Sequence, residues 1–198
     1  YALALRSRDL GLYRQSVAAA TRLAVLSPDG LLGAPRFVQQ LIYPTYFGDL
    51  VAAEGTDQGI DPLLIFALIR QESTFEPGAR SSAAAQGLMQ VIPDTAVWVA
   101  DSMGWPNFTP GDIYKPYLNV KFGVYYLDTA LEIFDGDVYA ALVGYNAGPG
   151  NAQHWLASAA TTDDDLFVEE ITLSEPRLYV RRVLANYAAY KRLYSDQP

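Results

Sequence analysis

Apolar residues along this chain recur at three- and four-residue intervals, and few segments alternate between apolar and polar positions. Intervals of this kind place the apolar side chains on one face of an α-helix. The pattern predicts helices over residues 46–58, 62–73, 93–103, 116–134, 138–145, 151–158 and 175–194. Only residues 167–173 have any strand character. We therefore expect a mainly α fold.

The first part of the chain forms a group of its own in this pattern. It is rich in Ala, Leu and Arg at helical spacing, and a turn at residues 27–30 divides it. Tyr43 precedes Pro44, and the residue before a proline avoids the α region. We place a boundary there. We expect a helical lead-in over residues 1–45, the end of a longer helical region, and a second domain over residues 46–198.

Residues that start or stop helices mark the ends of the predicted elements. Asp61 followed by Pro62 is typical of a helix start, with Asp as N-cap and Pro at the first helical position. Asp137 and Ser174 have the side chains expected of N-caps. We expect a loop with one helical turn over residues 79–91. The acidic stretch at residues 161–165 is expected to be a further, solvated loop.

Composition excludes several classes of function. The chain has 198 residues, a formal net charge of −8 and a pI near 4.5, which argues against nucleic-acid binding through a basic face. It has no cysteine and one histidine, which excludes disulfides, thiolate chemistry and Cys/His zinc sites. No apolar run reaches about 18 residues, so we expect no membrane-spanning segment. The 14 tyrosines either fill the core or offer flat surfaces to sugar rings.

The most informative position is Glu72, in the stretch RQESTF. On a helix from residue 62 it shares a stripe with Ile65, Leu68 and Ile69, while Arg70 lies about 200° away. Burial and the nearby helix C-terminus both disfavour a charged carboxyl and raise its pKa. A carboxyl that is protonated near neutral pH serves as a general acid. A second interpretation remains open, in which the stem packs and the carboxyl reaches water.

Four later motifs accompany Glu72-Ser73 in a fixed order. They are Gly-Leu-Met-Gln at 87–90, Pro-Asp-Thr-Ala at 93–96, Tyr-Asn-Ala-Gly at 145–148 and Glu-Pro-Arg-Leu-Tyr-Val at 175–180. In this order and spacing the chain resembles the soluble lytic transglycosylases, enzymes with a lysozyme-like domain that cut peptidoglycan. The resemblance extends over residues 44–194. It implies a lysozyme-like α-helical domain preceded by the short helical lead-in.

The resemblance implies roles for residues in the first motifs. Glu72 matches the catalytic acid/base of the family. Ser81 matches a polar residue beside that glutamate, and Gly87 and Gln90 match the segment that lines the floor of the cleft. Gly87 is also compatible with a purely conformational role in a turn.

The later motifs supply the remaining sugar-binding candidates. Tyr145 and Asn146 match the pair that faces the catalytic carboxyl, and Glu175 and Tyr179 match sugar-binding residues on the closing helix. Three structural roles stay open beside these. Tyr145 also suits the core, Asn146 suits a helix C-terminus, and Glu175 suits a helix N-terminus.

Four positions depart from the pattern of the family. Ala84 stands where glycine is usual, and its methyl group is expected to alter the loop over the cleft. Ile92 replaces a methionine, Thr172 a proline, and Pro176 the threonine of Glu-Thr-Arg. Proline suits a helix start, so we expect the fold to tolerate Pro176.

The mechanism of the family uses one carboxyl. The resemblance implies that Glu72 protonates the glycosidic oxygen between N-acetylmuramic acid and N-acetylglucosamine. The muramic acid C6 hydroxyl then attacks the anomeric carbon and leaves a 1,6-anhydro sugar. Metal ions and organic cofactors are not implied. The implied partner is a peptidoglycan glycan strand, and the implied location is the periplasm or cell envelope. A hydrolytic lysozyme-like enzyme is an alternative, with Glu76, Asp94 or Glu175 as its second carboxylate. A non-catalytic glycan-binding domain is another.

Overall fold

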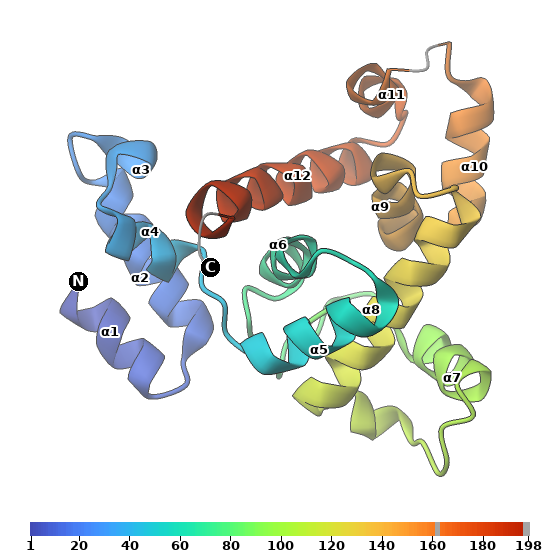
Figure 1. Ribbon diagram of the computed structural model, residues 1–198, viewed down its shortest axis with the longest axis horizontal. Coiled ribbons are helices and arrows are strands. Elements are labelled where there is room, and N and C mark those ends of the chain that lie inside the picture. The colour runs from blue at the N-terminus through green and yellow to red at the C-terminus, as the bar shows by residue number, and fades with distance from the viewer. Residues whose placement is uncertain (161–162, 196–198) are drawn as a thin grey trace.

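The protein is built from α-helices joined by loops, of which residues 73–92 between α6 and α7 form a long one (Figure 1). The computed structural model describes residues 1–160 and 163–195. Helix bounds are α1 Ala2–Asp9, α2 Tyr13–Val25, α3 Gly30–Gly33, α4 Arg36–Ile42, α5 Gly48–Gln58, α6 Pro62–Glu72, α7 Pro93–Ser102, α8 Pro116–Ile133, α9 Val138–Ala147, α10 Pro149–Ser158, α11 Asp164–Glu170 and α12 Ser174–Tyr194, with the 3-10 helix η1 at Pro110–Tyr114. The described residues contain no β-strand, which confirms the mainly α prediction.

Two of the predicted helix starts are confirmed in atomic detail, and one is wrong. The Asp61 carboxylate accepts a hydrogen bond from the backbone N–H of Leu63 at 2.9 Å, and Asp137 caps α9 in the same way. Ser174 does not cap α12, because the helix already includes it and Leu173 occupies the N-cap position.

The strand predicted at residues 167–173 is also wrong, because residues 164–170 form helix α11. The Asp163 carboxylate accepts a hydrogen bond from the backbone N–H of Leu166 at 3.0 Å and so caps this helix. Phe167 and Val168 are buried against the main core. We expected a solvated loop over residues 161–165. From residue 163 on, the chain instead forms the N-cap and the first turn of α11. Residues 161–162 lie outside the described part of the chain.

The loop over residues 79–91 forms without the predicted helical turn. Two isolated β-bridges, Arg80 to Gln86 and Gln86 to Val91, hold it instead. The loop leads directly into α7.

Helix α6 lies in the middle of the main core. Every residue from Leu64 to Ile69 is buried, and Figure 1 shows α6 between α12 and α5. Its neighbours in the core are α12 and α5, and the core continues into α8 and α9. Each fully buried large apolar side chain contributes about 1.5–3 kcal/mol relative to exposure. A helix that is apolar all round requires such a surrounded position.

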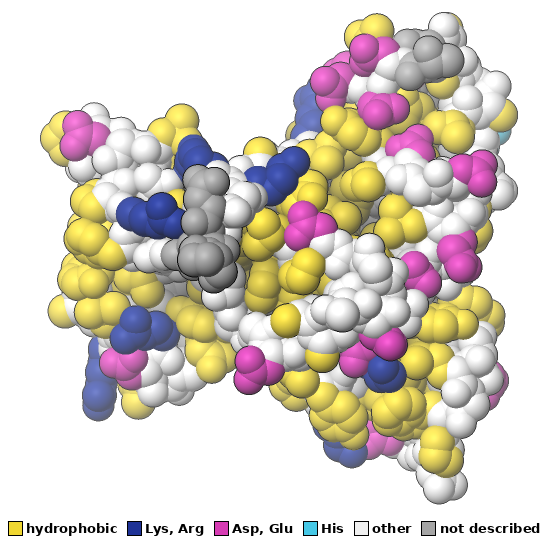
Figure 2. Space-filling model, in the orientation of Figure 1, with side chains coloured by type: hydrophobic (Ala, Val, Ile, Leu, Met, Phe, Trp, Pro, Cys, Tyr) yellow, Lys and Arg dark blue, Asp and Glu magenta, His cyan; other side chains and the backbone are white. Residues whose placement is uncertain are grey.

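Helices α1–α4 build a second, smaller core. Its buried members are Ala4, Ala20, Ala24, Ala34, Val38, Leu41 and Ile42. This segment carries five of the arginines, and Figure 2 shows Lys and Arg side chains gathered over it on the face in view. The domain boundary near residue 45 stays a prediction. The presence of two separate cores agrees with it.

Arg70 links the two cores. Its guanidinium donates hydrogen bonds to the carbonyl oxygen of Ile42 at 2.8 Å and to Asn186 Oδ1 at 2.9 Å, and it lies 4.4 Å from the ring centre of Tyr43. It therefore points away from Glu72, as the helical geometry predicted. None of the described helices is long and apolar enough to cross a membrane.

Replacing Arg70 by alanine is expected to lower the free energy of unfolding by about 2–3 kcal/mol, because the buried Asn186 amide and the Ile42 carbonyl lose a charged donor. Urea denaturation followed by circular dichroism measures this change. The control is Arg22→Ala on the exposed side of α2, for which we expect little effect. Equal unfolding midpoints for both variants would contradict the role given to Arg70.

Candidate active site

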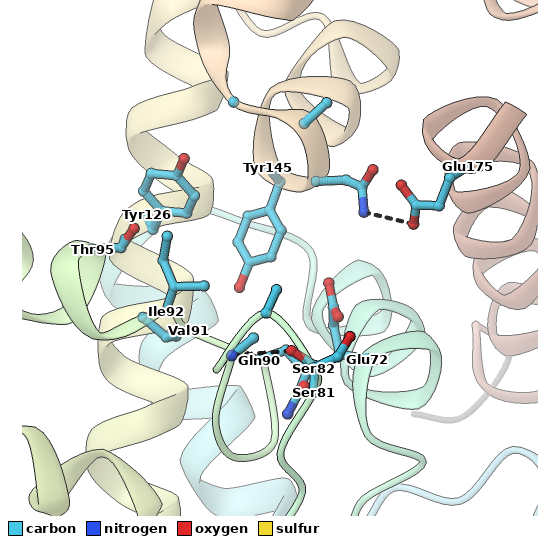
Figure 3. Close-up of a pocket in the computed structure, with 15 residues that line it drawn as sticks. Glu72, Ser81, Ser82, Gln90, Val91, Ile92, Thr95, Tyr126, Tyr145 and Glu175 are labelled. Atoms are coloured by element: carbon cyan, nitrogen blue, oxygen red, sulfur yellow. Dashed lines mark hydrogen bonds between the residues drawn. The ribbon is translucent and has the colours of Figure 1, made fainter. Parts of the chain in front are cut away.

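A cavity of about 650 Å³ opens beside the C-terminal end of α6. Its walls come from the end of α6, the loop over residues 81–92, the first turn of α7, the middle of α8, the end of α9 and the start of α12. Figure 3 shows side chains from these elements converging on one space. Segments more than 100 residues apart in the sequence therefore meet at one site.

Most of the predicted site residues line this cavity. Those that do are Glu72, Ser81, Gln90, Tyr145, Asn146 and Glu175. Tyr179 is not among the lining residues; it is buried, and its hydroxyl contacts the Glu72 carboxyl group. Gly87 is not among the lining residues.

Glu72 is the last residue of α6, and its carboxyl group is held by α12. The Tyr179 hydroxyl donates a hydrogen bond to Glu72 Oε1 at 2.5 Å. Burial raises the pKa of Glu72 to about 8, the hydrogen bond from Tyr179 opposes this rise, and the negative charge of Glu175 adds to it. A carboxyl group with this pKa is mostly protonated at neutral pH. Of the two interpretations of Glu72, this geometry favours the general acid.

Two tyrosines define the surroundings of this acid. Tyr145 donates a hydrogen bond from its hydroxyl to the carbonyl oxygen of Met89 at 2.8 Å, which fixes the end of α9 to the loop. Burial raises the pKa values of Tyr145 and Tyr179 well above 10, and the nearby Glu72 carboxyl adds to both shifts. Both phenols therefore stay protonated and act as hydrogen-bond donors.

Asn146 and Glu175 meet on the side of the cavity formed by α9 and α12 (Figure 3). Asn146 Nδ2 donates to Glu175 Oε1 at 3.2 Å. Asn146 Oδ1 is buried and has no hydrogen-bond partner in the described part of the chain. A buried polar atom of this kind in a ligand cavity is commonly satisfied by the ligand or by water.

Comparison with known proteins identifies this arrangement. Residues 49–168 match the family model of the transglycosylase SLT domain. The chain belongs to the transglycosylase SLT domain family.

Relatives and solved structures agree with this assignment. The chain is 35% identical over 158 residues to the soluble lytic murein transglycosylase of Escherichia coli K12, a match that covers 79% of the chain and 24% of the relative. The 70 kDa soluble lytic transglycosylase Slt70 of Escherichia coli superposes with a TM-score of 0.84 at 30% identity, over 99% of this chain and 30% of that one.

The lytic transglycosylase Slt of Pseudomonas aeruginosa, solved as an inactive variant with glutamine in place of a glutamate, also has a TM-score of 0.84, at 29% identity over 100% of this chain and 31% of that one. The fold is therefore that of the matching part of Slt70, which confirms the expected lysozyme-like domain. The chain spans about a quarter of the length of the curated relatives it matches.

The loop of this SLT domain is fixed by a buried asparagine, Asn119, that was not predicted from the sequence. Asn119 Oδ1 accepts from the backbone N–H of Met89 at 2.7 Å, and its Nδ2 donates to the carbonyl oxygens of Gln86 and Ile113 at 2.9 Å. The signal was present in the sequence: Asn119 is a polar residue beside Leu118 on the predominantly apolar helix over residues 116–134. Such a position demands partners, which the loop supplies.

Ser81 and Gln90 also serve the loop. Ser81 Oγ accepts a hydrogen bond from the backbone N–H of Ala85 at 3.0 Å, and none links it to Glu72. Gln90 Nε2 donates to the carbonyl oxygen of Gly87 at 2.9 Å. Both side chains line the cavity while they stabilise its wall.

Gly87 has a conformational role in this loop. Its φ is +78°, and a Cβ atom there would lie 2.2 Å from Asn119 Nδ2. Ala84, which stands where the family has glycine, adopts a φ of +64°. A non-glycine residue in that region is strained, so Ala84 holds its place in the loop at an energetic cost, and the expected change of the loop relative to the family stays a prediction.

The cavity lining also includes Thr95 and Tyr126, which were not predicted to bind sugar. Tyr126 follows the apolar periodicity of its helix and therefore looked like a core residue. Its ring centre lies 5.2 Å from that of Tyr145, at the cavity wall. Periodicity alone does not distinguish a buried face from one that borders a cavity.

Gly87→Ala is expected to destabilise the protein by several kcal/mol, because it combines a strained φ with a clash against Asn119. Gly136→Ala is the matched control: its φ is also positive, at +84°, but nothing lies within 4 Å of an added Cβ. We expect it to cost only about 1 kcal/mol. Thermal unfolding of both variants provides the measurement, and equal losses would refute the packing role of Gly87.

Proposed function

We propose that this protein is a peptidoglycan lytic transglycosylase. It cleaves the β-1,4 bond between N-acetylmuramic acid and N-acetylglucosamine and leaves a 1,6-anhydromuramic acid end. The observation that carries the proposal is the carboxyl group of Glu72, with a pKa of about 8, at the wall of a 650 Å³ cavity. Membership of the SLT domain family supports it. The Pseudomonas relative that is inactive with a glutamate changed to glutamine supports the need for one carboxyl.

In the first step Glu72 acts as the general acid. Its proton passes to the glycosidic oxygen, the bond from that oxygen to the muramic acid C1 breaks, and both bonding electrons stay on the oxygen. The resulting carboxylate at Glu72 is stabilised by the hydrogen bond from Tyr179. The substrate's own N-acetyl group stabilises the positive charge at C1.

In the second step the same residue acts as the general base. The Glu72 carboxylate takes the proton of the muramic acid C6 hydroxyl, whose oxygen attacks C1 and closes the anhydro ring. Glu72 is protonated again at the end of the cycle. The nucleophile belongs to the substrate, so its effective concentration is high and no second carboxylate is needed to hold water.

The hydrolytic alternative rests on Glu175. Of the three candidates for a second carboxylate, Glu76, Asp94 and Glu175, only Glu175 lines the cavity. It also raises the pKa of Glu72 and accepts a hydrogen bond from Asn146. These contacts give Glu175 an electrostatic and positioning role in the transglycosylase mechanism.

We further propose that the protein works on glycan strands outside the cytoplasm, in the periplasm or cell envelope, because peptidoglycan is found there. The relatives with matching sequences are named as soluble and as membrane-bound murein transglycosylases. These names support murein as the substrate class.

Digestion of purified peptidoglycan, with mass analysis of the muropeptide ends, tests the proposal. The protein is expected to release anhydro ends, and Glu72→Gln to lower the rate by at least about 100-fold while still binding glycan. Glu76→Gln, four residues away and outside the cavity lining, is the matched control and should keep the parent rate. Reducing ends would indicate hydrolysis, and a Glu72→Gln variant at the parent rate would refute the mechanism.

A further inference from the structure

A row of aromatic rings leads from the cavity to the surface of the molecule. The ring centres of Tyr145 and Tyr126 lie 5.2 Å apart, and that of Trp98 lies 6.3 Å from Tyr126 and 6.1 Å from Tyr125. Tyr145 and Tyr126 line the cavity, whereas Trp98 stands just outside it and is 44% exposed.

Helix geometry places Trp98 at the rim of the cavity. Thr95, in the first turn of α7, lines the cavity, and Trp98 follows it by three residues. The two side chains therefore share one face of the helix, separated by about 4.5 Å along its axis. Figure 3 shows Ile92, Thr95 and Tyr126 grouped on the side of Tyr145 that faces away from Glu175. The row of rings thus extends the cavity at the end remote from Glu175.

Two further apolar side chains near Trp98 in the sequence are also exposed. Ile92 and Val97 are 43% and 42% exposed, so three large apolar side chains lie open within seven residues. By contrast, Trp155 is buried, and its indole N–H donates to Thr172 Oγ1 at 3.0 Å. Among the described residues no hydrogen bond is made by the indole N–H of Trp98. A flat apolar face beside a free donor suits a ligand that is apolar on its ring face and polar at its edge.

Charge narrows the choice of ligand. Asp94 and Asp101 lie four residues before and three residues after Trp98, so they flank it on the same side of α7. Their carboxylates repel an anion, and the lactyl group of a muramic acid unit without a stem peptide carries a carboxylate. An N-acetylglucosamine unit is uncharged and presents a C–H face to the indole.

We propose that Trp98, supported by Tyr125 and Tyr126, forms an additional saccharide-binding position that takes an N-acetylglucosamine unit of the glycan strand outside the cavity. The proposal rests on the proposed function and deepens it, because it makes affinity depend on strand length. A strand that reaches from Glu72 past Tyr126 gains the contact with Trp98. A short fragment confined to the cavity does not.

Isothermal titration calorimetry with peptide-free glycan fragments tests this position. All variants carry Glu72→Gln, so that the fragments are not cleaved during the titration. Trp98→Ala is expected to weaken binding of an octasaccharide by about tenfold, the scale of one well-formed aromatic contact. Binding of a disaccharide should change by less than about twofold.

Two further variants separate binding from packing. Trp98→Phe keeps a flat ring and should retain most of the octasaccharide affinity, whereas Trp98→Leu fills space without a ring and should lose it. Tyr117→Ala is the control, because Tyr117 is 48% exposed and lies nine residues before Tyr126 on α8, away from the cavity lining. It should bind both fragments as the parent does.

Three results would overturn the proposal. They are unchanged octasaccharide binding in Trp98→Ala, an equal loss for both fragments, and full octasaccharide affinity in Trp98→Leu. If the parent binds neither fragment, the proposed function itself fails, and this extension fails with it. If the parent binds the fragments and the Trp98 variants bind them equally well, only the proposed saccharide position at Trp98 fails.

Discussion

The site depends on the packing of α6 against α12. Residues Leu64 to Ile69 of α6 are buried, and the carboxyl group of its last residue, Glu72, accepts a hydrogen bond from the Tyr179 hydroxyl on α12. The same contact that completes the core therefore positions the carboxyl group at the wall of the cavity. The free energy needed to hold a carboxyl group there comes from the surrounding apolar burial.

The lead-in helices reinforce this arrangement at the ends of both central helices. Arg14 on α2 donates two hydrogen bonds, at 3.2 and 3.1 Å, to the carbonyl oxygen of Ser73, the residue after Glu72. Arg36 on α4 donates to the carbonyl oxygen of Leu193 near the end of α12. Carbonyl groups at a helix C-terminus lack intrahelical partners, and a cation is favoured there. The basic lead-in thus caps the two helices that hold the acid and its tyrosine.

Local features of the site were predictable from the sequence, and long-range ones were not. Asp61-Pro62 fixed the start of α6, and periodicity then put Glu72 on the apolar stripe. The hydrogen bond between Tyr179 and Glu72 joins residues 107 positions apart, and it was not predicted, because the resemblance assigned Tyr179 to sugar binding. The role of Gly87 depends on Asn119, a contact that no local pattern contains. The strand predicted at residues 167–173 does not form, because Asp163 caps a helix that includes residues 167–170.

The central claim is that Glu72 holds its proton at neutral pH. Carbon-13 NMR titration of the glutamate side-chain carboxyls, with Glu72→Gln used to assign the signal, measures this directly. We expect a pKa of about 8 for Glu72. We also expect a higher value in Tyr179→Phe, because that variant removes the donor that stabilises the carboxylate. A Glu72 pKa near the ordinary value of about 4.3 would contradict the claim.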